Sequence, residues 1–155
     1  MLDDEAFIQS VGLYSGSKLQ RVSLDDEYLD SVVEQEQNLP GALFGEGCTQ
    51  FKGKIYQMTY REGKVIVFDP VTLEITAQLP MPSEMEEGWG LTHDDAHLYA
   101  SDGTNRIFKI EPTTFKVLQI IPVTDLSGNP LRFINELELV GDYIYGNVLP
   151  QNIVV

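Results

Sequence analysis

A repeat with a period in the low forties limits the folds that this chain can adopt. Ile55-Tyr56 recurs as Leu98-Tyr99, 43 positions later, and Phe68-Asp69-Pro70 recurs as Ile110-Glu111-Pro112, 42 positions later. Downstream, Ile144-Tyr145 follows Leu98-Tyr99 by 46 positions. Each copy consists of short apolar runs separated by Asp, Asn, Gly or Pro, as in antiparallel hairpins. The chain is therefore predicted to consist of repeated units of short strands.

Short strands that recur every 40–45 residues or so are typical of the blades of β-propellers. Complete repeats are expected near 46–80 and 87–123, and partial ones at 12–39 and 135–155. We therefore predict an all-β fold, an incomplete β-propeller of about three to four blades over residues 12–155. The alternative is an ordinary meander in which the similarity between the units is due to chance.

Two segments match the repeat less well. Residues 1–11 are acidic, carry no strong strand signal and are interpreted as an N-terminal segment outside the propeller. Residues 12–24 are expected to form a hairpin around Ser15-Gly16-Ser17. Residues 25–39 are compatible with a short helix and equally with a strand centred on Val32-Val33, because their apolar spacing suits both.

The charge of the chain disfavours nucleic acid and anionic membranes as partners. Asp and Glu number 24 against 10 Lys and Arg, so the formal net charge is −14, whereas phosphate binding depends on clustered Lys and Arg. The chain has no apolar run of about 18 residues, the length of a membrane-spanning helix. Residues 1–5 lack the basic and apolar regions of a signal peptide. As written, the chain is expected to be intracellular unless it is a fragment, and its compartment stays open.

Neither the cysteine nor the histidines form a recognised catalytic or metal-binding motif. The single cysteine, Cys48, excludes an internal disulfide and a multi-cysteine metal site, and we interpret it as a small core residue. His93 and His97 are four positions apart, a spacing that chelates metals on a helix, but here they lie at the end of a hairpin. We predict no metal site and no cofactor.

Three chemically useful residues stand at corresponding places in successive repeats, namely Glu46, Trp89 and Asn135. Because the innermost strand of each blade lines the channel of a propeller, these side chains are expected to converge on one concave site. A carboxylate in a partly dry channel has a raised pKa and suits proton transfer. The alternative is structural: the neighbouring glycines permit tight turns, and the Glu and Asn side chains cap loop amides.

Several segments occur in the order in which they are found in glutaminyl cyclases of the plant and bacterial type. They are Gly12-Leu13-Tyr14, Phe44-Gly45-Glu46-Gly47, Ile55-Tyr56-Gln57-Met58-Thr59-Tyr60, Phe68-Asp69, Gly88-Trp89-Gly90-Leu91, Leu98-Tyr99-Ala100-Ser101-Asp102-Gly103, Asn135-Glu136-Leu137-Glu138 and Ile144-Tyr145-Gly146-Asn147. The chain from about residue 9 onward therefore resembles this family. The resemblance implies a five-bladed propeller that converts an N-terminal glutaminyl residue to pyroglutamyl and releases ammonia. Full-length members are often secretory or extracytoplasmic.

The resemblance also implies roles for individual positions. Glu46 matches the main acid/base of the family, and Trp89 and Asn135 match a tryptophan and an asparagine of the channel. Tyr60, which by position would bind substrate, stands where the family usually has tryptophan, and Leu149 stands where it usually has another. The family's Phe-Thr-Gln-Gly segment and its site lysine have no match in this chain.

The prediction is therefore a glutaminyl-peptide cyclotransferase with Glu46 as general acid/base and a peptide or protein with N-terminal Gln as substrate. One alternative is a non-catalytic propeller module that binds a peptide or protein partner, with Tyr60 and Leu149 marking the loss of catalysis. Another is an inactive truncated product. Because an incomplete ring leaves two open flanks, self-association through open blade edges is also expected.

Overall fold

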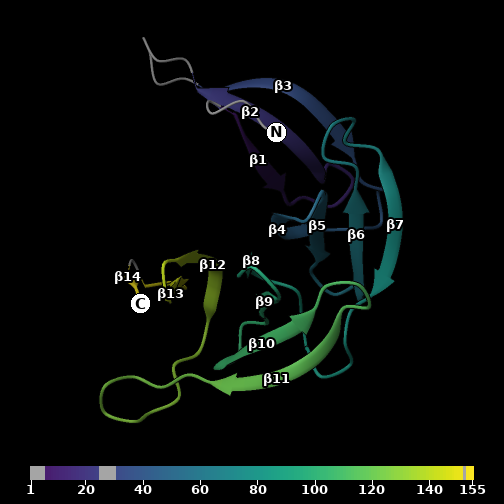
Figure 1. The fold of residues 1–155 in the computed structure, drawn as a ribbon. Coiled ribbons are helices and arrows are strands. Elements are labelled where there is room, and N and C mark those ends of the chain that lie inside the picture. The colour runs from purple at the N-terminus through teal and green to yellow at the C-terminus, as the bar shows by residue number, and fades with distance from the viewer. Residues whose placement is uncertain (1–5, 25–30, 152) are drawn as a thin grey trace.

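Four antiparallel sheets follow one another along the chain in the computed structural model, which describes residues 6–24, 31–151 and 153–155 (Figure 1). Each sheet is built from strands consecutive in sequence, and the four fan around a common centre. Over these ranges no helix occurs, so the all-β prediction is confirmed there. Accordingly, the described part of the chain offers no helix long and apolar enough to cross a membrane.

The strands divide among the sheets in sequence order. The first sheet contains β1 (Ala6–Val11), β2 (Lys18–Leu24) and β3 (Ser31–Asn38). The second contains β4 (Gly45–Phe51), β5 (Lys54–Thr59), β6 (Lys64–Phe68) and β7 (Ile75–Pro80). The third contains β8 (Leu91–His93), β9 (Leu98–Ser101), β10 (Arg106–Glu111) and β11 (Lys116–Pro122). The fourth contains β12 (Ile134–Val140), β13 (Tyr143–Val148) and β14 (Ile153–Val154).

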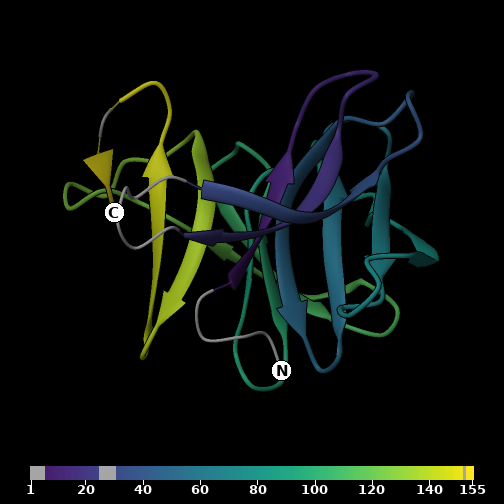
Figure 2. The same ribbon diagram turned by 90° about the horizontal axis from the view of Figure 1, so that it is seen from above.

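The repeat in the sequence corresponds to this arrangement. The repeated apolar-Tyr pair lies in the second strand of the second, third and fourth sheets, at Tyr56, Tyr99 and Tyr145. Full repeats were expected near 46–80 and 87–123, and the two four-stranded sheets span 45–80 and 91–122. The second and fourth sheets lie on opposite sides of the centre, which is also visible from above (Figure 2).

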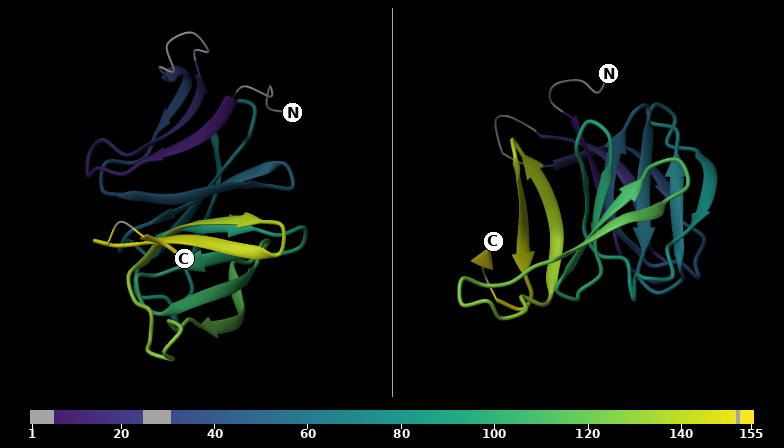
Figure 3. Two further views of the ribbon diagram at one scale, coloured as in Figure 1. Left: turned by 90° about the vertical axis from the view of Figure 1, so that its left-hand side faces the viewer. Right: turned by 60° about the horizontal axis from the view of Figure 1, so that its bottom comes forward.

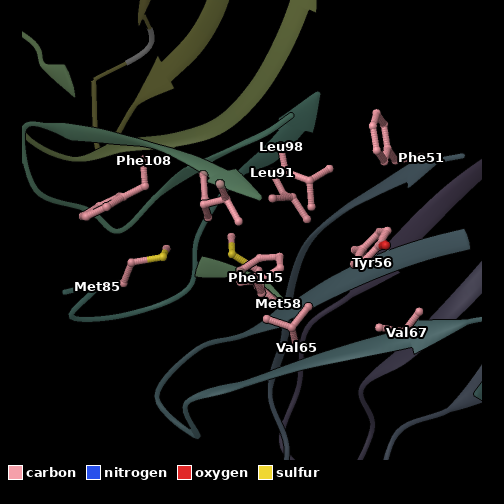
Figure 4. Close-up of a cluster of buried hydrophobic side chains, with 12 residues drawn as sticks. Phe51, Tyr56, Met58, Val65, Val67, Met85, Leu91, Leu98, Phe108 and Phe115 are labelled. Carbon is pink, nitrogen blue, oxygen red and sulfur yellow. The ribbon is translucent and has the colours of Figure 1, made fainter. Parts of the chain in front are cut away.

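Apolar side chains fill the spaces between neighbouring sheets. In β5, Ile55 packs toward the first sheet, whereas Tyr56 and Met58 belong to the cluster shared with the third sheet (Figure 4). Successive side chains of a strand point to opposite faces, so β5 is buried on both faces from Ile55 to Thr59. A smaller cluster of Ile107, Ile134 and Leu137 joins the third and fourth sheets.

The inner strands approach one another backbone to backbone. Going around the centre, β1 contacts β4, β4 contacts β8 and β8 contacts β12. The Gly47 N–H donates a hydrogen bond of 2.7 Å to the Trp89 carbonyl oxygen, and a Cβ at Gly47 would lie 2.4 Å from that oxygen. A Cβ at Gly90 would lie 2.2 Å from the Asn135 carbonyl oxygen. Glycine is therefore required at both places because a side chain would hold the sheets apart.

The first sheet corrects one sequence-based prediction, at β1, and decides between two alternatives at β3. Residues 6–11 were assigned to an acidic segment outside the propeller, and this is wrong, since they form β1, which pairs with β2 from Ala6↔Ser23 to Val11↔Lys18. The hairpin predicted over residues 12–24 therefore extends over 6–24, with residues 6–11 as its first strand. Residues 31–38 form a strand, which excludes the helix there, while residues 25–30 lie outside the described part. Figure 3 shows this sheet and the third on either side of the fourth.

Candidate active site

A pocket of about 400 Å³ lies where the second, third and fourth sheets meet. Its volume is within the range of roughly 300–1,000 Å³ found for small-molecule sites. It is lined by a carboxylate, three aromatic rings, a carboxamide and an aliphatic side chain, which belong to Glu46, Phe44, Tyr60, Trp89, Asn135 and Leu149. No lysine or arginine is among these lining residues, so the pocket favours neutral or cationic groups.

All four residues proposed from the sequence line this one pocket. Glu46 lies in β4 and Tyr60 directly after β5, both in the second sheet. Trp89 lies in the segment that leads into β8, and Asn135 in β12. Leu149, directly after β13, completes the lining. Three sheets thus bring together the four proposed residues, of which Glu46 and Asn135 are 89 positions apart in the sequence; that they act on a substrate remains a prediction.

Glu46 is the acid/base candidate of the pocket. Its side chain is partly buried, and loss of surrounding water raises the pKa of its carboxyl from 4.5 to about 7. The carboxylates of Glu136, Glu87 and Glu62 contribute further to this increase, in that order, because they repel a new negative charge. A group with a pKa near 7 can both accept and deliver a proton at neutral pH.

A second hollow of about 480 Å³ adjoins the pocket along the inner strands. It is lined by residues of β1, β4 and the fourth sheet, among them Gly47, Cys48 and Glu136. This hollow lies between the first and fourth sheets, at what we call the open side of the ring. Glu136 is exposed there, yet neighbouring protein atoms displace part of its water shell and raise the pKa of its carboxyl. The centre of the molecule therefore carries two carboxyl groups whose charged forms are disfavoured by loss of water, and the charge of Glu136 adds to this effect at Glu46.

An aromatic wall borders the pocket on the side of the second sheet. The ring of Phe44 packs against Tyr60, with centroids 5.9 Å apart, and edge-on against Tyr14, with centroids 5.1 Å apart. The Tyr14 hydroxyl donates a hydrogen bond of 3.0 Å to Glu62 Oε1. Phe44 lines the pocket but was not proposed as a site residue from the sequence. Its position two residues before Glu46, directly before the inner strand β4, is the signal that could have indicated it.

Asn135 and Trp89 are fixed through their backbones by a serine of the third sheet. Ser101 Oγ donates a hydrogen bond of 2.6 Å to the Asn135 carbonyl oxygen and accepts one of 2.7 Å from the Gly90 N–H. The Ser101 N–H also donates to the Gly90 carbonyl oxygen at 3.0 Å. This buried serine therefore sets the distance between two walls of the pocket.

The cysteine and the histidines lie outside this pocket. Burial raises the pKa of the Cys48 thiol to about 12, so it is neutral at physiological pH and a poor nucleophile. His93 Nδ1 shares a hydrogen bond of 2.9 Å with Thr49 Oγ1, and His97 Nδ1 lies 3.5 Å from Asp94 Oδ1. Among the residues that the structure describes, no three His, Cys, Asp or Glu side chains gather as a metal site.

Comparison with known proteins places the chain in a family. A sequence model described as glutamine cyclotransferase matches residues 1–155, the whole length of the chain. The chain belongs to the glutamine cyclotransferase family. Within this family it is 28% identical over 145 residues to a glutaminyl-peptide cyclotransferase of Arabidopsis thaliana.

Solved structures agree with this family assignment. The crystal structure of the Myxococcus xanthus glutaminyl cyclase has a TM-score of 0.79 and 25% sequence identity over 97% of the chain. The WD40 domain of Neurospora crassa Pan2, at 14% identity and a TM-score of 0.57, supports the propeller-like fold alone. The chain spans 43% of the length of the Arabidopsis protein and 65% of the Myxococcus structure.

Proposed function

We propose that this chain acts as a glutaminyl-peptide cyclotransferase, converting the N-terminal glutaminyl residue of a peptide or protein to pyroglutamyl with release of ammonia. The observation that carries this proposal is Glu46, a carboxyl with a pKa near 7 in a pocket of aromatic and amide side chains, in a chain of the glutamine cyclotransferase family. The absence of cationic lining residues suits a substrate whose reacting end is an amine.

In the proposed mechanism, Glu46 moves one proton from the nucleophile to the leaving group. The neutral α-amine attacks its own γ-carboxamide carbon, and the new C–N bond closes a five-membered ring. Glu46 accepts a proton from the attacking nitrogen and then delivers it to the amide nitrogen, whose C–N bond breaks to release ammonia. General acid–base catalysis of this kind contributes about 10²- to 10⁴-fold to a rate.

The remaining pocket residues would hold the substrate in its reactive conformation. Since the reaction is intramolecular, much of the barrier is removed when amine and amide carbon are kept in contact. Trp89 and Tyr60 would enclose the glutaminyl side chain, and Asn135 would exchange hydrogen bonds with the substrate amide or backbone. Tyr60 and Leu149 are smaller than the tryptophans that the family usually has, so the pocket would be wider on two sides.

Ammonia release from a Gln-initiated dipeptide amide tests this function directly. The wild-type chain should release ammonia, and Glu46→Gln should lower kcat by about 10²-fold or more while the far-UV circular dichroism stays unchanged. Glu34→Gln, at an exposed position of β3, is the matched control. Peptide binding without ammonia release in the wild type would instead support the non-catalytic binding module.

We also propose that the chain self-associates through the open side of its ring. The first and fourth sheets both contribute to the hollow of about 480 Å³ there, and its lining includes Phe7, Tyr145 and Val154, which are 41%, 45% and 68% exposed. Exposed strand edges beside apolar side chains favour pairing with a second copy.

A further inference from the structure

The indole of Trp89 is held by a carboxylate that is not itself part of the pocket lining. Its Nε1–H donates a hydrogen bond of 2.9 Å to Oε2 of Glu87. The Glu87 side chain is only 18% exposed and does not line the pocket. A hydrogen bond to a charged acceptor is stronger than one between neutral groups, so this contact restricts rotation of the indole.

The other oxygen of the same carboxylate is held by the second sheet. Glu87 Oε1 lies 2.7 Å from Arg61 Nε and 2.6 Å from Arg61 Nη2. The guanidinium of Arg61 lies over the ring of Tyr60, 4.6 Å from its centroid. Glu87 therefore connects two pocket walls, Tyr60 and Trp89, that come from different sheets.

The backbone brings these groups together. The Gly88 N–H donates a hydrogen bond of 2.8 Å to the Tyr60 carbonyl oxygen, and a Cβ at Gly88 would lie 2.3 Å from the Thr59 carbonyl oxygen. The segment that carries Glu87 and Trp89 is thus pressed against the end of β5. The indole packs against Gly103, where an added Cβ would lie 2.6 Å from Cζ2 of Trp89.

We propose that Glu87 is a positioning residue, which fixes the indole of Trp89 as a wall of the substrate pocket and is itself held by Arg61. This role rests on the proposed function, because it concerns the pocket that would bind the glutaminyl side chain. An indole without this anchor would have to be ordered by the substrate, and ordering a side chain lowers affinity. The charge of Glu87 has a second effect, since it contributes to the raised pKa of Glu46.

Intrinsic fluorescence tests the anchor without any assay of activity, because Trp89 is the sole tryptophan of the chain. Glu87→Ala should lower the fluorescence anisotropy and increase quenching by acrylamide. Glu87→Gln leaves one acceptor oxygen for two donors, the indole N–H and the Arg61 guanidinium, and should give intermediate values of both. Glu84→Ala removes a carboxylate from an exposed position of the same segment, between β7 and β8, and should leave both values unchanged.

Kinetics then separate positioning from charge. With the dipeptide amide as substrate, Glu87→Ala should lower kcat/KM by about tenfold, the value expected for loss of a hydrogen bond to a charged group. Glu87→Gln should lose less of kcat/KM than Glu87→Ala but shift the acid limb of its pH profile to lower pH, since a negative charge near Glu46 has been removed.

Unchanged anisotropy and quenching in Glu87→Ala would overturn the proposal. Should Glu87→Ala fail to fold, Arg61→Ala carries the same test, because the Arg61 side chain is 64% exposed; unchanged quenching in that variant would likewise overturn it. If the wild type releases no ammonia, the proposed function fails, while the fluorescence comparison still decides whether Glu87 anchors Trp89.

Discussion

The N–H of Gly47 donates a hydrogen bond of 2.7 Å to the carbonyl oxygen of Trp89 and so ties the inner strand that carries Glu46 to the segment that carries the indole. Gly47 lies in β4, and Trp89 lies 42 positions later in the segment that leads into β8. The same contact therefore holds the fold together and sets the distance between two proposed site residues.

Gly47→Ala should destabilise the chain and distort the pocket. The added Cβ would lie 2.4 Å from the Trp89 carbonyl oxygen and 2.7 Å from the Leu91 nitrogen, both backbone atoms. Overpacking of this kind costs about 1–3 kcal/mol, which urea denaturation would measure. Gly41→Ala is the control, because its nearest atom would be at 3.8 Å. Equal unfolding midpoints for the two variants would contradict the expectation.

Glu46→Gln should stabilise the folded chain at alkaline pH while it removes activity. Glu46 loses its proton near pH 4.5 in the unfolded chain and near pH 7 in the folded one. Between these values the folded state binds more protons, so the stability contributed by Glu46 falls as pH rises through this window. The variant should therefore be more stable than wild type at pH 8, by about 1–2 kcal/mol once solvent screening of the partly exposed carboxyl is included, and equally stable near pH 4.

Thermal melts of both proteins at several pH values measure this difference. The gap in free energy between variant and wild type should open between pH 4.5 and 7. A constant gap across the range would mean that the Glu46 carboxyl is not perturbed by its surroundings.

Glu136→Gln should shift the pH dependence of ammonia release to lower pH. Among the charges around Glu46, that of Glu136 contributes most to its raised pKa, so removing this charge makes Glu46 an available base at lower pH. The acid limb of kcat/KM should move, whereas the titration of the substrate amine stays the same. Glu138→Gln, two positions along β12, is the control. If the pH profiles of kcat/KM for wild type, Glu136→Gln and Glu138→Gln coincide, Glu46 does not carry out the rate-determining proton transfer.

The repeat allowed the sheets to be predicted because its anchors are local: a Tyr after an apolar residue, then a turn. This pattern is clearest where the strand is central in its sheet, as at Tyr56 in β5 and Tyr99 in β9. β1 was missed because none of its side chains is fully buried and its pairing with β2 decides its conformation. A sequence repeat reveals equivalent positions, and this is why Glu46 and Trp89 could be singled out without coordinates.

Contacts between sheets could not be predicted in the same way. In the sequence, Glu87 is one of several acidic residues between β7 and β8, and only the approach of Gly88 to the end of β5 places it beside Arg61. The pKa of Glu46 likewise depends on Glu136, which is 90 positions away in the sequence. Local patterns therefore indicate which residues face the centre, whereas the electrostatics of the centre require the packed sheets.

Leu149→Trp should tighten substrate binding if the pocket encloses a glutaminyl side chain. Leu149 lines the pocket and is 42% exposed, so a larger ring has room at this edge. An additional aromatic contact should lower KM by about tenfold, equivalent to about 1.4 kcal/mol of apolar burial. Leu126→Trp, on a fully exposed loop, controls for nonspecific binding to an added indole. An unchanged KM in Leu149→Trp would place the substrate elsewhere.

Val154→Lys should convert associated chains to monomers if the open side of the ring is an interface. Val154 lines the hollow there and is 68% exposed, and a lysine at this position would put a charge into the proposed contact. Val71→Lys is a close control, because Val71 is 69% exposed but lies in the turn between β6 and β7. Light scattering after size-exclusion chromatography, over a range of concentrations, gives the mass of each protein. Wild type and Val71→Lys should be heavier than Val154→Lys, whereas a monomeric wild type would show that the open side does not bind a second copy.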